Sequence, residues 1–226
     1  MHLNHAVVNN NYTVFIGASY NTEPPSCYSI DFDAASASNS SNKAVKIDLP
    51  STVQCKLLTS RTCVGSCDGI LCFSRQNILN DSITICLWNP STQEYKEIVK
   101  KYDGFVAAYG FCYDGKIDDY KLKLIYDKNP DFSEIQAYTL GSNSWKKIGN
   151  TLSVYYGTYS SHLVKGAMRW LARKVIVTGD QPAVTMVIVP FDIAEETTKI
   201  IQIPSCFSEL KIKCKFSSNS RVGVLG

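Results

Sequence analysis

A short motif occurs three times in this chain, and its spacing limits the possible folds more than any other feature. Each copy starts with an aromatic residue, at Trp88, Tyr138 and Phe191, so the copies lie 50 and 53 residues apart. A small polar residue, a polar turn, a Lys and an Ile then follow in the same order. Self-similarity at a fixed period of this length is typical of proteins built from repeated supersecondary units.

Short runs of alternating apolar and polar residues accompany these copies. Examples are residues 83–88, 120–126 and 135–140, which are bounded by Gly, Asn, Asp, Ser and Pro residues. Alternation with period two is typical of β-strands, and almost no stretch shows the helical period. The sequence therefore predicts an all-β protein.

Four strands per repeat would make each unit a β-propeller blade of kelch-like length, about 50 residues. A blade buries its two faces only against its neighbours, which explains strands that are apolar on both sides. A β-sandwich also has short strands, with turns every ~8 to 12 residues, but it does not predict the repeat. A glycine precedes an apolar strand in each unit, at Gly69, Gly110 and Gly166, and we expect a sharp loop at each. The chain lacks the double glycine of true kelch repeats.

The extent of the repeat predicts a partial propeller of roughly four blades whose ring is not closed. A degenerate earlier copy spans residues 28–33 and 45–50, with a serine-rich insertion at 34–42. Residues 221–226 resemble the opening of another blade. We therefore expect this chain to be part of a longer polypeptide.

Charge and hydropathy exclude several classes of function. The formal net charge is only +3 and the basic residues are scattered, whereas a nucleic-acid-binding surface is normally more basic and more clustered. Residues 9–11 are asparagines that interrupt any N-terminal apolar segment, and no apolar run approaches the ~20 residues of a spanning helix. We expect a soluble protein of the cytoplasm and/or nucleus, with neither nucleic acid nor membrane as a partner.

Groups that could support catalysis or hold a metal are sparse. The nine cysteines contain no C-x-x-C pair and the chain has three histidines, so buried reduced thiols are favoured over disulfides or zinc. His162 lies in no nucleophile-elbow context. Asp118 and Asp119, as neighbours on a strand, would point to opposite faces. The sequence predicts no catalytic residues, no metal site and no cofactor.

Six blocks of sequence resemble the F-box associated domain of plant F-box/kelch-type proteins. The blocks are residues 64–73, 87–96, 109–114, 118–122, 143–146 and 166–171. The resemblance covers residues 12–226, so residues 1–11 are interpreted as a tail following a missing F-box, and the domain as truncated at its C-terminus.

The resemblance implies a role in protein degradation. In this family an F-box binds a Skp-type adaptor of an SCF-type cullin-RING ubiquitin ligase, and the associated domain selects the target for ubiquitination. No F-box precedes Met1, so an adaptor contact would need an F-box absent from this chain. The alternatives are a lectin-like glycan-binding propeller and a truncated gene product without function.

Aromatic residues in the linkers between blades are the candidates for contact with an unknown target protein, because tyrosine buries a large area at low entropic cost. They are Tyr102, Phe105, Tyr155, Tyr156 and Tyr159. Packing against a neighbouring blade is the alternative role for such residues. Trp88, Trp145 and Trp170 recur in blade positions, and we expect them in the core.

Overall fold

The computed structural model of the chain consists of strands joined by turns. It describes residues 13–17, 27–31, 45–50, 61–77, 79–102, 105–127, 132–152, 155–156, 161–164, 166–178 and 181–203. The predicted tail, the serine-rich insertion, Tyr159 and residues 221–226 lie outside these ranges.

The strands form four antiparallel sheets, which we number as blades 1 to 4. Blade 1 contains β1 (Thr13–Gly17), β2 (Cys27–Asp31) and β3 (Val45–Ile47). Blade 2 contains β4 (Arg61–Cys67), β5 (Ile70–Asn77), β6 (Ser82–Trp88) and β7 (Tyr95–Lys101). Blade 3 contains β8 (Phe105–Asp114), β9 (Asp119–Asp127), β10 (Phe132–Thr139) and β11 (Ser144–Leu152). Blade 4 contains β12 (Tyr155–Tyr156), β13 (His162–Val164), β14 (Ala167–Thr178), β15 (Gln181–Asp192) and β16 (Ile201–Gln202).

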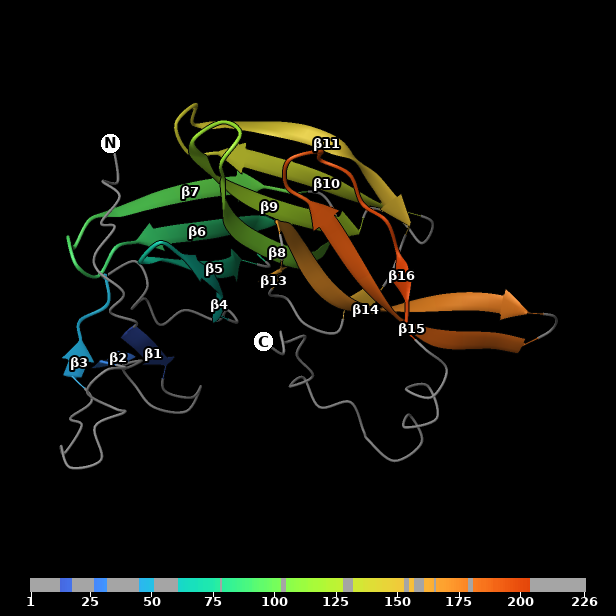
Figure 1. Ribbon diagram of the computed structural model, residues 1–226, viewed down its shortest axis with the longest axis horizontal. Helices are drawn as coiled ribbons and strands as arrows, with labels where there is room; N and C mark the ends of the chain where they lie inside the picture. Colours follow the sequence, from blue (N-terminus) through green and yellow to red (C-terminus); the bar gives the residue numbers. More distant parts are fainter. Residues whose placement is uncertain are drawn as a thin grey trace.

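Each sheet is a meander of strands that are consecutive in sequence. In blade 4, β12 and β13 both pair with β14, so the first strand of this blade is split in two. The sheets follow one another along an arc that the described residues do not close into a ring (Figure 1). The predicted all-β architecture of about four blades in an open ring is confirmed.

The sequence motif is the hairpin that joins the third and fourth strands of a blade. Its aromatic residue pairs with the residue seven positions later, as Trp88–Tyr95, Tyr138–Trp145 and Phe191–Thr198. The fifth residue after the aromatic has a positive φ in every copy, although none is glycine: Gln93 59°, Asn143 52° and Glu196 53°. The three hairpins therefore share one register and one turn geometry.

The three glycines play two different roles. Gly69 (φ 77°) and Gly166 (φ 73°) lie in the turns before β5 and β14, as predicted. Gly110 instead lies within β8, so the prediction of a loop there is wrong. A Cβ at Gly110 would lie 2.3 Å from the Sδ of Met168, so glycine permits close approach of blade 4. In the β8–β9 turn of blade 3, the residue with positive φ is Asp118 (52°).

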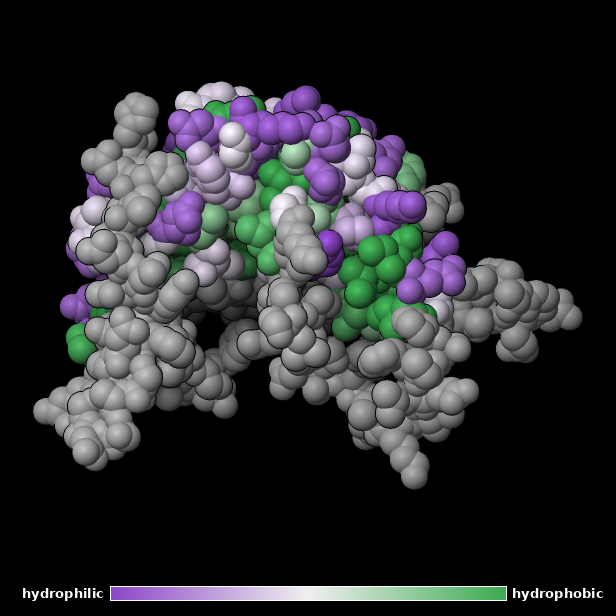
Figure 2. All heavy atoms as spheres, viewed as in Figure 1, coloured by the Kyte–Doolittle hydropathy of each residue, from purple (hydrophilic) through white to green (hydrophobic). Residues whose placement is uncertain are grey.

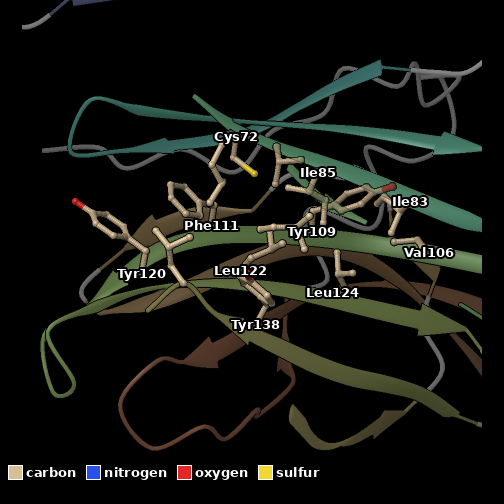
Figure 3. Packing of buried hydrophobic residues seen from close by; sticks show 14 of the residues in the cluster. Cys72, Ile83, Ile85, Val106, Tyr109, Phe111, Tyr120, Leu122, Leu124 and Tyr138 are labelled. Carbon is tan, nitrogen blue, oxygen red and sulfur yellow. The ribbon is translucent and has the colours of Figure 1, made fainter. Parts of the chain in front are cut away.

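Blade 3 buries both of its faces, as the propeller prediction requires. One face packs against blade 2 through a cluster that includes Tyr109, Leu122 and Tyr138 (Figure 3). The other face contributes Cys112 and Ile125 to a cluster with Met168, Trp170 and Phe191 of blade 4. Trp88 and Trp170 are fully buried, which confirms their predicted place in the core. Trp145 is half-buried and packs against the blade 2–blade 3 cluster.

Candidate functional site

The aromatic residues predicted from sequence lie where the chain passes from one blade to the next. Tyr102 follows β7, Phe105 begins β8, and Tyr155 and Tyr156 form β12. Phe105 and Tyr155 each begin the first strand of a blade, and β12 lies against β8. The backbone therefore places these residues at one end of the blades, which we call the linker end.

Tyr102 also has a structural role. Its ring is half-buried and stacks on Tyr126 of blade 3, with 6.1 Å between ring centroids. Its backbone nitrogen donates a hydrogen bond to the carbonyl oxygen of Asp81 at 2.9 Å. Tyr102 thus joins blades 2 and 3, which is the packing alternative considered for such tyrosines.

The opposite end of the blades carries the first hairpin turns and a network of tyrosines and carboxylates. The Tyr120 hydroxyl donates to Asp68 at 3.2 Å, and the Tyr113 hydroxyl bonds to Asp118. Burial, followed by the charge of Asp68, raises the pKa of Tyr120. The same two effects raise the pKa of the Cys67 thiol to about 11. Cys67 is therefore protonated at neutral pH, which is unlike an activated nucleophile.

Ion pairs fasten blade 3 to blade 4. Lys121 lies 2.7 Å from Asp114 and 2.8 Å from Glu196 of the β15–β16 turn, and Glu196 also pairs with Lys146 at 3.3 Å. Burial alone would raise the pKa values of Asp114 and Glu196. The hydrogen bond and the charge of Lys121 act together with the backbone N–H of Lys116 at Asp114 and with Lys146 at Glu196. These effects combined outweigh burial, so both carboxyl pKa values lie below their usual range.

Substituting Glu196→Gln should make the protein less sensitive to acid. Both carboxyl groups stabilise the fold above their ordinary pKa values of 3.8 and 4.5, and this contribution is lost as the pH falls through the lower folded values. We expect the variant to lose about 1 kcal/mol at pH 7, and to lose less further stability than the wild type between pH 5 and pH 3. Urea unfolding at each pH measures both effects. The control is Glu195→Gln, whose pair with Lys116 is exposed, and an equal acid response in both variants would contradict the assignment.

Lys123 is buried in the same interface, and its amino group has no hydrogen-bond partner among the described residues. Its Nζ lies 3.1 Å from the centroid of the Phe191 ring. In the sheet it stands between Gly110 and Ala137, and these two small residues leave room for its side chain. Burial lowers the pKa of Lys123 to about 7.

Sequence reasoning missed a groove between blades 3 and 4. It has a volume of about 380 Å³. Its lining residues are Asn150, Thr151, Lys174, Thr198, Ile200 and Gln202. A signal was available in the repeat, because Thr198 occupies the motif position where the other copies have Tyr95 and Trp145.

Reactive groups do not gather in the described part of the chain. No three His, Cys, Asp or Glu residues there are placed to hold a metal ion. These ranges also contain no helix long and apolar enough to cross a membrane. The described surface mixes hydrophilic residues over the outer strands β7 and β11 with a hydrophobic group over β15 and β16 (Figure 2). The fold and its surfaces define a β-propeller repeat domain.

Comparison with known proteins assigns this propeller to a family. The F-box associated beta propeller domain matches residues 21–220, and the chain belongs to this family. Among curated proteins, F-box protein At3g07870 of Arabidopsis thaliana is 29% identical over 169 residues, which cover 63% of this chain and 39% of that protein. F-box/kelch-repeat protein At3g23880 of the same plant is 24% identical over 152 residues, again 63% and 39%. The matches thus span about two fifths of these relatives, and the family is consistent with a substrate-binding module.

Proposed function

We propose that this domain is the substrate-recognition module of an F-box protein, which selects a target for ubiquitination by an SCF-type cullin-RING ligase. Membership of the F-box associated family is the observation that carries the proposal. The match covers the associated domain, so binding of a Skp-type adaptor is proposed for the F-box of a whole protein. The proposed setting is the cytoplasm and/or the nucleus.

The architecture supports a binding role at the linker end. Blades 2, 3 and 4 are joined by continuous packing and by the Lys121–Glu196 pair, which makes them a stiff scaffold. Segments that connect blades can vary without unfolding such a scaffold. We propose that Phe105, Tyr155 and Tyr156, together with Tyr102 and Tyr159, contribute to the contact with the target.

The test is to join this chain to an F-box and express it in plant cells. We expect specific proteins to gain ubiquitin and fall in abundance, and we expect Phe105→Ala combined with Tyr155→Ala and Tyr156→Ala to abolish the effect. The matched control is Tyr95→Ala, which removes an exposed aromatic from the outer strand β7. Quantitative proteomics with a proteasome inhibitor measures the outcome. If no protein responds to the wild-type fusion, or the control variant loses the response equally, the proposal is wrong.

A further inference from the structure

The groove between blades 3 and 4 lies beside two positions at which small residues replace aromatic ones. At the blade 2–blade 3 junction, aromatic rings fill the corresponding space. The Nζ of Lys100 lies 5.0 Å from the centroid of the Trp145 ring, and Tyr126 stacks on Tyr102. In blade 4, Thr198 takes the position of Trp145, because both pair with the aromatic residue of the motif.

Comparing the strand pairing of blades 3 and 4 shows that Ala172 of blade 4 occupies the position that Tyr126 has in blade 3. Tyr126 pairs with Glu134, four residues before Tyr138, and Ala172 pairs with Val187, four residues before Phe191. Interiors are close-packed, so smaller residues at two aromatic positions leave less side-chain volume to fill this junction. At ~30 Å³ for each water molecule, the groove of about 380 Å³ has room for one side chain and part of its backbone.

The chemistry of the lining favours an anion. Lys174 is half-buried, is the only charged residue of the lining, and has no ion pair with a carboxylate in the described ranges. Asn150, Thr151 and Gln202 add amide and hydroxyl groups that can donate hydrogen bonds. A cation beside neutral donors, with no carboxylate among the described lining residues, matches the needs of a carboxylate or phosphoryl group.

The remaining lining residues shape the groove. The Thr198 hydroxyl already donates to the carbonyl oxygen of Pro190 at 2.8 Å, which fixes its methyl-bearing side chain. Ile200 packs against Ala172 and Val187 and supplies an apolar wall. The groove therefore has one charged position and one apolar side, as a site for an extended peptide side chain requires.

We propose that this groove binds an anionic side chain, glutamate, aspartate or a phosphorylated residue, in a peptide segment of the protein that the domain selects. The inference rests on the proposed function, since it names the chemistry of the selected partner. It adds a second contact, on the side of the propeller between two blades, to the aromatic contacts at the linker end.

The test titrates the whole chain with two probes, inorganic phosphate and N-acetylglutamate amide, at constant ionic strength with chloride as the reference. Backbone amide NMR signals report on the groove. We expect saturable shifts at Lys174, Thr151 and Gln202. Tighter binding of phosphate would indicate a phosphorylated residue, and tighter binding of N-acetylglutamate amide would indicate an acidic one.

Two substitutions remove the site in different ways. Lys174→Met removes the charge, and Ala172→Tyr places beside the groove the residue type found at the matching position of blade 3 while keeping Lys174. We expect both to weaken probe binding about tenfold, whereas Lys174→Arg keeps it. The matched control is Lys101→Met, which removes an exposed lysine from β7. If Ala172→Tyr shifts the amide signals of core residues, the result for Lys174→Met alone tests the inference.

Shifts that grow linearly with probe concentration, or that persist unchanged in Lys174→Met, would overturn the inference. This failure is distinguishable from failure of the proposed function. Loss of anion binding with target ubiquitination intact rejects only the groove. Anion binding without any ubiquitinated target rejects the proposed function.

Discussion

Replacing Lys123 by Met should stabilise the protein, by about 2 kcal/mol at pH 6. The folded chain buries the amino group of Lys123, which finds no hydrogen-bond partner in the part of the chain that the structure describes, and burial lowers its pKa from 10.5 to about 7. The thioether of Met can keep the contact with the Phe191 ring that the amino group now makes. The substitution removes a buried polar group and leaves the packing of the interface in place.

The pH dependence of this effect identifies its cause. Between about pH 7 and pH 10.5 the unfolded chain holds a proton on Lys123 that the folded chain has released, so the wild-type contribution to stability rises with pH across this window. Below pH 7 the folded chain carries the full free-energy cost of burying a charged Lys123. The advantage of Lys123→Met should therefore be largest at pH 6 and should shrink by pH 9, as urea unfolding of both proteins would show.

Lys101→Met is the control, because it removes an exposed lysine. The difference between variant and wild type matters here, because the Cys112 thiol, whose pKa burial raises to about 12, also contributes to the alkaline response of both proteins. A gain in stability that is equal at pH 6 and pH 9 would show that the penalty does not come from the charge of Lys123, and a loss at both would show that its burial carries no penalty.

Trp170→Ala should have the largest destabilising effect, about 4 kcal/mol. Trp170 is fully buried between blades 3 and 4, and its indole nitrogen donates to the Tyr109 carbonyl oxygen at 2.8 Å. The substitution leaves a cavity at the junction and removes this hydrogen bond. Because domains are stable by only about 5–15 kcal/mol, the variant should unfold at much lower denaturant concentration.

A pair of conservative variants separates the hydrogen bond from the cavity. Trp88 is equally buried, but its indole nitrogen has no hydrogen-bond partner among the described residues. Trp170→Phe should therefore lower the free energy of unfolding by about 1 kcal/mol more than Trp88→Phe does. Equal costs, measured by urea unfolding, would mean that the Trp170 hydrogen bond contributes nothing to the junction.

Features that repeat along the chain could be predicted from the sequence. The spacing of Trp88, Tyr138 and Phe191 predicted one unit per blade, and the structure gives all three the same place at the end of a third strand. The alternation at 120–126 predicted β9 for the same reason. The period of apolar residues depends on the local backbone geometry of a segment. A unit that repeats shows the same pattern several times, which makes it easier to recognise in the sequence.

Contacts between blades could not be predicted in this way. The alternation of Lys121 and Lys123 with apolar residues predicts a strand but not the burial of both lysines, which results from blade 4 covering that face of blade 3. The sequence predicts a loop at Gly110, whereas the role of this glycine depends on Met168, which is distant in sequence. Single-sequence patterns do not state which face the next blade covers.

One part of the candidate site could be predicted from the sequence and another could not. The linker position of Phe105 and Tyr155 followed from the repeat, and their contact with a target stays a prediction. The groove could not be found from local pattern alone, because its lining comes from two blades. Thr151 belongs to β11, whereas Lys174 belongs to β14 and Thr198 to the segment between β15 and β16.

The shared geometry of the three hairpins has a consequence for how such domains diversify. Segments 89–94, 139–144 and 192–197 each connect strands in the same register and place a residue of positive φ at the same step. Genetic recombination between repeats, or the grafting of a foreign loop, would therefore exchange these segments without shifting the strands on either side. A gene family whose members share these hairpins can acquire new surfaces by exchanging turn segments between repeats. A protein engineer can insert the same foreign loop at any of the three turns.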